Sequence, residues 1–201
     1  MPCINDNLNK VQQQIDEAAK SSGRATSDIT LLAVSKTRPA EELREAYQQG
    51  VRDFGENYLQ DAVAKIEQLA DLDICWHFIG PLQSNKTRPV AEHFHWVHSV
   101  ERLKIAQRLN QQRPESMPPL NICIQVNISA EASKSGVTLN ELPVLAQQIS
   151  ELPKLKLRGL MAIPATGKDF DQQRQVLQPM KTALATLQNN YPQLDTLSMG
   201  M

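Results

Sequence analysis

Strand-like and helix-like segments alternate regularly along all 201 residues of this sequence. Short apolar runs alternate with longer stretches in which apolar residues recur every three or four positions. Such an alternation predicts parallel strands joined by right-handed crossover helices, which is an α/β fold. The expected strands cover 29–35, 51–54, 74–79, 95–98, 120–126, 155–161 and 194–198, and the expected helices cover 40–49, 57–70, 83–92, 101–112, 139–151 and 169–190.

Two architectures fit these segments: an open, doubly wound sheet and a (β/α)8 barrel. No glycine-rich phosphate loop follows the first strand, which weakens the doubly wound, nucleotide-binding interpretation. A barrel needs eight strands, however, and only seven can be recognised, so both stay open. An extra amphipathic helix is expected before the first strand, because apolar residues recur there at helical spacing: Ile4, Leu8, Val11, Ile15 and Ala18.

Composition excludes several classes of function. The formal net charge is −1, so no basic surface for nucleic acid is expected. Cys3, Cys75 and Cys123 are odd in number and far apart, which predicts neither a disulfide framework nor a metal-binding cysteine pair. No metal site is expected. No signal peptide or membrane-spanning stretch is visible, so we expect a cytoplasmic protein with no membrane partner.

Lys36 is the first candidate functional residue. It follows the run 29–35, which is typical of a strand buried on both faces of a parallel sheet. Ligands bind at the carboxyl ends of such strands. An amine desolvated in that position has a lowered pKa and can attack aldehydes. The alternative is a lysine that is simply solvated at the rim.

Other strand ends also carry groups that chemistry could use, and each has a structural alternative. Asn57 and Ser99 could be helix caps, and Gly200 could be a turn glycine. His77 lies inside an apolar strand, which favours a core histidine with a satisfied hydrogen bond. The groups that follow the remaining strands include His98, Asn127, Met161 and Ser198.

Several segments resemble a known family in order and over nearly the whole chain. Residues 54–61 read FGENYLQD and residues 77–86 read HFIGPLQSNK, and three shorter segments are VSKT at 34–37, SKSG at 133–136 and RGLMAI at 158–163. These segments resemble the signatures of the pyridoxal-phosphate homeostasis proteins.

The resemblance implies an α/β, TIM-like (β/α)8 barrel forming a single domain over residues 1–201, similar to the N-terminal domain of alanine racemases. It implies the cofactor pyridoxal 5′-phosphate (PLP), held as an internal aldimine on Lys36. The implied role is to bind and buffer PLP without catalytic turnover, so the protein is not expected to be an enzyme. The implied cofactor-binding residues are Lys36, Asn57 and Met161 near the ring, and Ser198, Met199 and Gly200 at the start of the phosphate-binding loop.

The same resemblance suggests PLP-dependent apo-enzymes as recipients of the cofactor, and we expect a monomer. A PLP-dependent amino-acid racemase is the enzymatic alternative, but racemisation needs bases on both faces of the substrate, and related racemases take one from a second domain. A Schiff-base aldolase and a binding module with an inert Lys36 are further alternatives. Lys134 is either a secondary PLP contact or part of a lid.

Members of this family continue past the segment that matches Met201. We therefore expect the last strand and helix of the barrel to be missing from this chain. That segment carries an arginine expected beside the pyridine nitrogen and further donors for the phosphate. A chain without it is expected to hold PLP weakly.

Overall fold

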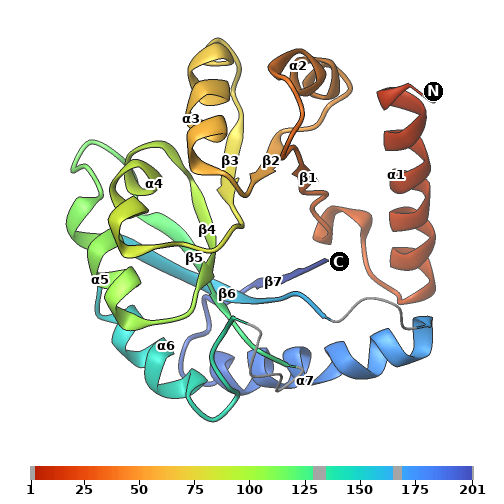
Figure 1. Ribbon diagram of the computed structural model, residues 1–201. Coiled ribbons are helices and arrows are strands. Elements are labelled where there is room, and N and C mark those ends of the chain that lie inside the picture. The colour runs from red at the N-terminus through yellow and green to blue at the C-terminus, as the bar shows by residue number, and fades with distance from the viewer. Residues whose placement is uncertain (1–2, 129–134, 165–168, 201) are drawn as a thin grey trace. The chain divides into compact units, whose positions relative to one another are not determined.

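The computed structural model describes residues 3–128, 135–164 and 169–200. The chain forms two compact units, Met1–His77 and Phe78–Met201, and each is described by itself. Lys134 lies outside the described residues. Figure 1 labels the helices and strands. In both units strands and helices alternate along the chain, as the sequence predicts.

The first unit begins with a helix and continues with strands that neighbour one another in chain order. Strands β1 and β2 are parallel, with Ala33 opposite Phe54 and Val34 opposite Gly55. The core of this unit includes the fully buried Leu43, Phe54 and Ala62. Its elements are α1 (Ile4–Ser21), a 3-10 turn (Thr26–Asp28), β1 (Ala33–Val34), α2 (Ala40–Gln48), β2 (Asp53–Glu56), α3 (Leu59–Gln68) and most of β3 (Cys75–Phe78).

The prediction of a long first strand, buried on both faces, is wrong. Strand β1 has two residues, and Val34 is 49% exposed. Among the described residues only β2 is a hydrogen-bonded neighbour of β1, so β1 lacks the second neighbouring strand that a central strand has. An apolar run therefore identified the position of this strand but not its length or burial, because burial depends on which elements pack against it.

The second unit contains parallel strands β4, β5, β6 and β7, each beside the next in the sequence. The core between these strands and their helices includes Val97, Ile122, Ile124 and Leu160, none of them exposed. Its elements are η2 (Ser84–Lys86), α4 (Thr87–His93), β4 (Trp96–Val100), α5 (Leu103–Gln112), β5 (Leu120–Gln125), α6 (Leu142–Ser150), β6 (Leu155–Ala162), α7 (Phe170–Gln188) and β7 (Thr196–Met199).

The sheet of the second unit is strongly curved. Strands β5 and β6 lie between β4 and β7, and a flat sheet would hold β4 and β7 roughly 14 Å apart. His98 Nδ1 of β4 nevertheless lies 2.7 Å from Ser198 Oγ of β7. Both side chains therefore lie on the concave face. Closing parallel strands into a barrel requires curvature of this kind.

A polar cluster ties the amino ends of these strands together. Arg158 donates two hydrogen bonds to the carboxylate of Asp195, at 3.0 and 2.6 Å, and one to Asn121 Oδ1 at 3.0 Å. Its guanidinium also stacks 4.7 Å from the centroid of the Trp96 ring. These contacts link β4, β5, β6 and β7 near their amino ends. In α/β barrels, residues at this end of the strands mainly stabilise the fold.

The helix-cap interpretation of Ser99 is also wrong. Ser99 lies within β4, and its hydroxyl donates to the carbonyl of Gly80. The following helix, α5, is instead preceded by Arg102.

In the part of the chain that is described, no helix has the length and apolar character needed to cross a membrane.

Candidate functional site

Lys36 lies in a turn just past the end of β1. Its side chain is exposed, which differs from the desolvated position expected from the sequence. The next residue, Thr37, has a φ of 64°, a left-handed conformation that is uncommon outside glycine. Pro39 then precedes α2, as predicted. The turn therefore projects Lys36 outward at the carboxyl end of the strand, where an amine can meet a ligand.

A buried polar network fixes the residue immediately before Lys36. Ser35 donates from its Oγ to Glu56 Oε1 over 2.6 Å. Lys65, from helix α3, donates to the same Glu56 oxygen at 2.7 Å and to the backbone carbonyl of Ser35 at 2.8 Å. Glu56 is fully buried and Lys65 nearly so. A hydrogen-bonded ion pair in the core holds both the side chain and the main chain of Ser35, and so positions the turn.

Asn57 lies beside Lys36 in the strand register. Because Val34 is opposite Gly55 and Ser35 N donates to Gly55 O at 2.9 Å, Lys36 and Asn57 reach the same level. Tyr58, not Asn57, is the N-cap residue of α3, so the cap interpretation of Asn57 is wrong. Its Oδ1 is buried and has no hydrogen-bond partner among the described residues. A buried acceptor of this kind is what a bound polar ligand would satisfy.

The other predicted residues lie in the second unit. Met161 on β6 is opposite Ser198 on β7, and Ala162 is opposite Met199. Met161 is buried, whereas Ser198 is half-buried and hydrogen-bonded to His98. Met199 is 44% exposed and Gly200 follows at the carboxyl end of β7. Within each unit the strand pairing brings the predicted residues together: Lys36 with Asn57, and Met161 with Ser198.

A cavity of about 330 Å³ opens at the carboxyl ends of β5 and β6 in the second unit. Predicted residue Met161 does not line it, although Ile163 and Pro164 just beyond do. Asn127 was recognised from its position after a strand, but Gln125 and Ser135 were missed because neither stands out in the sequence. The remaining lining residues are Ile79, Pro81, Val126 and Ile128.

Gly136 lies against the backbone of Val126 and Asn127, which line this cavity. Its φ is +119°, and a Cβ there would lie 2.7 Å from Asn127 N, so no larger residue fits. Its backbone N–H donates to Glu101 Oε2 at 3.0 Å. The described end of the SKSG segment is thus held against the carboxyl end of β5.

His77 is a core histidine with a satisfied hydrogen bond, as predicted. Its Nε2 lies 2.9 Å from Asp53 Oδ1, and this bond holds the pKa of Asp53 below the usual range of a carboxyl group. Cys75 is half-buried beside this pair, and Cys123 is fully buried in the second unit. Burial raises the pKa of the Cys123 thiol to about 12, so this thiol is chemically inert.

Comparison with known proteins identifies the family to which this chain belongs. The model of the family "Alanine racemase, N-terminal domain" matches residues 7–201. A pyridoxal phosphate homeostasis protein of Pseudomonas aeruginosa (strain PAO1) is 56% identical over 201 residues, which cover all of this chain and 86% of that protein. The protein of the same name from Escherichia coli (strain K12) is 54% identical, over 98% of this chain and 86% of that protein.

Solved structures of related proteins are similar to the structure of this chain. PipY of Synechococcus elongatus PCC7942, in a structure with PLP bound, is similar with a TM-score of 0.77 and 35% identity, over 93% of this chain and 87% of that chain. The structure of PipY without PLP gives a TM-score of 0.81 and 38% identity, over 93% and 88% of the two chains. The chain belongs to the alanine racemase N-terminal domain family and, within it, to the pyridoxal phosphate homeostasis proteins.

Proposed function

We propose that this protein binds PLP and serves PLP homeostasis, with Lys36 as the residue that holds the cofactor. The names of its relatives and the PLP-bound structure of PipY support this proposal. When bound, PLP supplies an aldehyde that condenses reversibly with a primary amine. Lys36 supplies that amine, and its exposure on the turn after β1 leaves the amine accessible.

The main evidence for the proposal is the buried hydrogen-bond network next to Lys36. The Ser35, Glu56 and Lys65 network holds the turn from inside the core, although buried ion pairs seldom add net stability. A network of this kind restricts the backbone conformations from which the Lys36 side chain projects. Such preorganisation is expected of a residue that must present its amine in one direction.

The remaining residues are proposed to contact the cofactor. The Oδ1 of Asn57 is a buried acceptor at the level of Lys36 with no partner in the described part of the chain, which suits a polar group of the cofactor. We assign Met161 to the pocket near the ring, and Ser198, Met199 and Gly200 to the phosphate, whose oxygens need convergent donors from a glycine-containing loop. We further propose that the strands form part of a single (β/α)8 barrel domain; the curvature of β4 to β7 supports this.

Binding without catalytic turnover is part of the proposal. The relatives are named for PLP homeostasis and not for a reaction. The fold family is that of alanine racemases, however, so racemisation is the alternative to test. We propose a cytoplasmic monomer that releases PLP to apo-enzymes, as the sequence led us to expect.

An absorption titration tests the proposal. The purified protein is titrated with PLP, and the visible band of the imine is compared in wild type, Lys36→Ala and Lys104→Ala. Lys104 is an exposed lysine on α5 and serves as the matched control. The band is expected in wild type and Lys104→Ala and largely lost in Lys36→Ala. An equally strong band in Lys36→Ala would contradict the assignment. Conversion of L-alanine to D-alanine by the loaded protein would contradict the non-enzymatic role.

A further inference from the structure

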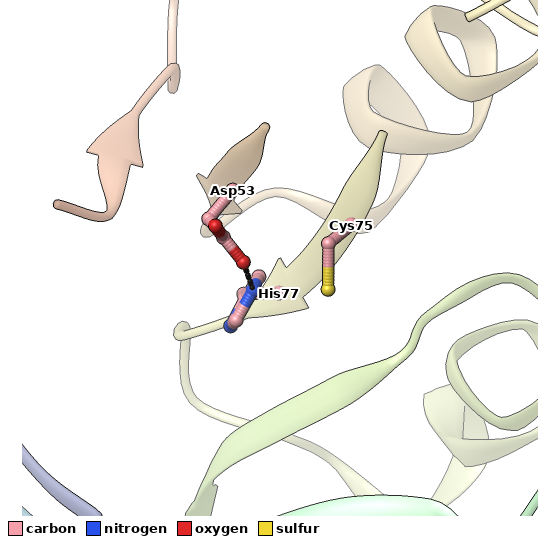
Figure 2. Close-up of side chains that lie close together, drawn as sticks. All are labelled: Asp53, Cys75 and His77. Carbon is pink, nitrogen blue, oxygen red and sulfur yellow. Dashed lines mark hydrogen bonds and ion pairs between the residues drawn. The ribbon is translucent and has the colours of Figure 1, made fainter. Parts of the chain in front are cut away.

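Three side chains with metal-binding groups converge in the first unit, away from the turn that carries Lys36. They are Asp53, Cys75 and His77, whose ligand atoms all lie within 4.8 Å of one another. Asp53 begins β2 and Cys75 begins β3, and His77 is the third of the four residues of β3. Figure 2 shows the three side chains close together. Lys36 and Asn57 follow the carboxyl ends of β1 and β2. The two sites are therefore distinct.

Strand geometry explains the convergence. Cys75 and His77 are two residues apart on β3, and such residues lie on the same face of a sheet. Cys75 N donates to Arg52 O at 2.8 Å, which aligns the start of β3 with the start of β2 and places Asp53 alongside. The intervening Phe54 and Trp76 lie on the other face, where their ring centroids are 6.1 Å apart. The face shared by Asp53, Cys75 and His77 is polar by comparison.

The chemistry of the three donor groups indicates which metal ion they would bind. One thiolate, one imidazole and one carboxylate suit zinc, whereas calcium and magnesium prefer oxygen ligands alone. Thiolate and carboxylate together balance the two charges of Zn²⁺. The His77 side chain is 6% exposed and that of Asp53 is 27% exposed, so the group is embedded but open on one side. That opening leaves room for a fourth ligand from solvent.

We propose that Asp53 Oδ1, Cys75 Sγ and His77 Nε2 bind Zn²⁺, with water as the fourth ligand. Binding releases the thiol proton of Cys75 to solvent. The proton on His77 Nε2 passes to Nδ1 through solvent exchange, so that the Nε2 lone pair faces the metal. Two tetrahedral zinc ligands lie roughly 3.3 Å apart. The 2.9 Å pair of Asp53 and His77 must therefore open by a few tenths of an ångström.

Cobalt titration of the reduced, metal-stripped 201-residue chain tests this proposal without reference to PLP. Co²⁺ is the probe because a cobalt–thiolate bond gives a charge-transfer band. The variants are Cys75→Ser, which removes the proposed ligand, and Cys3→Ser, which removes the exposed cysteine as a control. The band is expected in wild type and Cys3→Ser, to be displaced by Zn²⁺, and to be absent in Cys75→Ser. Zinc affinity should fall by more than about 100-fold in Cys75→Ser, since lost outer-shell partners alone reduce it 10–100-fold.

A second measurement on wild type does not depend on how the variants fold. Alkylation of each cysteine is followed by peptide mass spectrometry with and without equimolar Zn²⁺. Zinc is expected to protect Cys75 and leave the labelling of Cys3 unchanged. No cobalt band, a band that survives in folded Cys75→Ser, or equal labelling of Cys75 with and without Zn²⁺ would each overturn the proposal. Asp53, Cys75 and His77 would then have a structural role only, which includes the hydrogen bond between Asp53 and His77.

Discussion

Ser35 Oγ donates a hydrogen bond to Glu56 Oε1 over 2.6 Å, immediately before the turn that carries Lys36. The same oxygen accepts from Lys65 at 2.7 Å. A strand-end serine, a strand-end glutamate and a helix lysine therefore act together in the core of the first unit. The buried ion pair of Glu56 and Lys65 positions the turn that carries the exposed Lys36. Changes to this pair are therefore expected to affect both the stability of the protein and the binding of the cofactor.

Removing one partner of the buried ion pair should be strongly destabilising. Lys65→Met leaves the Glu56 carboxylate buried without its cation, and we expect a loss of about 3–5 kcal/mol in the free energy of unfolding. The double variant Lys65→Met/Glu56→Leu should recover much of that loss, because the unpaired charge is gone. Urea denaturation measures the free energy of unfolding of the single and the double variant. A single substitution that costs less than about 1 kcal/mol would contradict a fully desolvated pair.

Gly159 should not tolerate a side chain. A Cβ on this β6 residue would lie 1.8 Å from the carbonyl oxygen of Thr196 on β7. Gly159→Ala must push the two strands apart, and we expect a loss of about 1–3 kcal/mol. Gly200→Ala is the matched control, because no atom of the other described residues, its chain neighbour apart, lies within 4 Å of a Cβ there. Thermal or urea unfolding of the two variants checks the difference, and equal stability would refute the close approach of β6 and β7.

The cysteines should differ sharply in reactivity. Burial raises the pKa of Cys123 to about 12, so almost none of this thiol is ionised near neutral pH. Cys3 is exposed and should react with iodoacetamide in the native protein. Peptide mass spectrometry after brief labelling is expected to find Cys3 modified and Cys123 modified only after denaturation. Labelling of both at the same rate would show that Cys123 is accessible.

Part of the acid sensitivity should come from Asp71. A two-point hydrogen bond from Arg44, at 2.6 and 2.8 Å, holds the pKa of Asp71 below its usual range. A carboxyl group whose pKa is lowered by folding contributes stability above its unfolded pKa and loses it as the pH falls through the folded value. Arg44→Gln should therefore flatten the fall in stability below about pH 4. Both groups are exposed, so the change should be small, and added salt should reduce it. Identical acid-unfolding curves would contradict the assignment.

Local signals in the sequence predicted the elements well. Pro39 and Gly50 were expected to bound a helix, and α2 runs from Ala40 to Gln48 between them. These residues act through their own backbone conformations, as the φ of +96° at Gly50 illustrates, so neighbours are not needed to interpret them. Strand β1 was mispredicted because the length and burial of a strand depend on the strands and helices around it.

Sequence reasoning found the ends of the strands but not the contacts behind them. It recognised Lys36 and Asn57 because parallel strands end at one edge. It missed Lys65, since a lysine on an amphipathic helix is usually solvated and nothing in the sequence marks this one as buried. It also overlooked the group of Asp53, Cys75 and His77, because Asp53 is more than twenty positions from the other two and meets them only when β2 and β3 pair.

Borohydride trapping identifies the lysine that holds PLP. The protein is loaded with PLP, reduced with borohydride, digested and mapped by mass spectrometry. Reduction makes the bond between PLP and its lysine permanent, so the pyridoxyl mass marks the residue that held it. We predict that the mark falls on the peptide containing Lys36 and that Lys104 stays unmarked. A mark spread evenly over exposed lysines, or its absence from the Lys36 peptide, would show that Lys36 is not the residue that holds PLP.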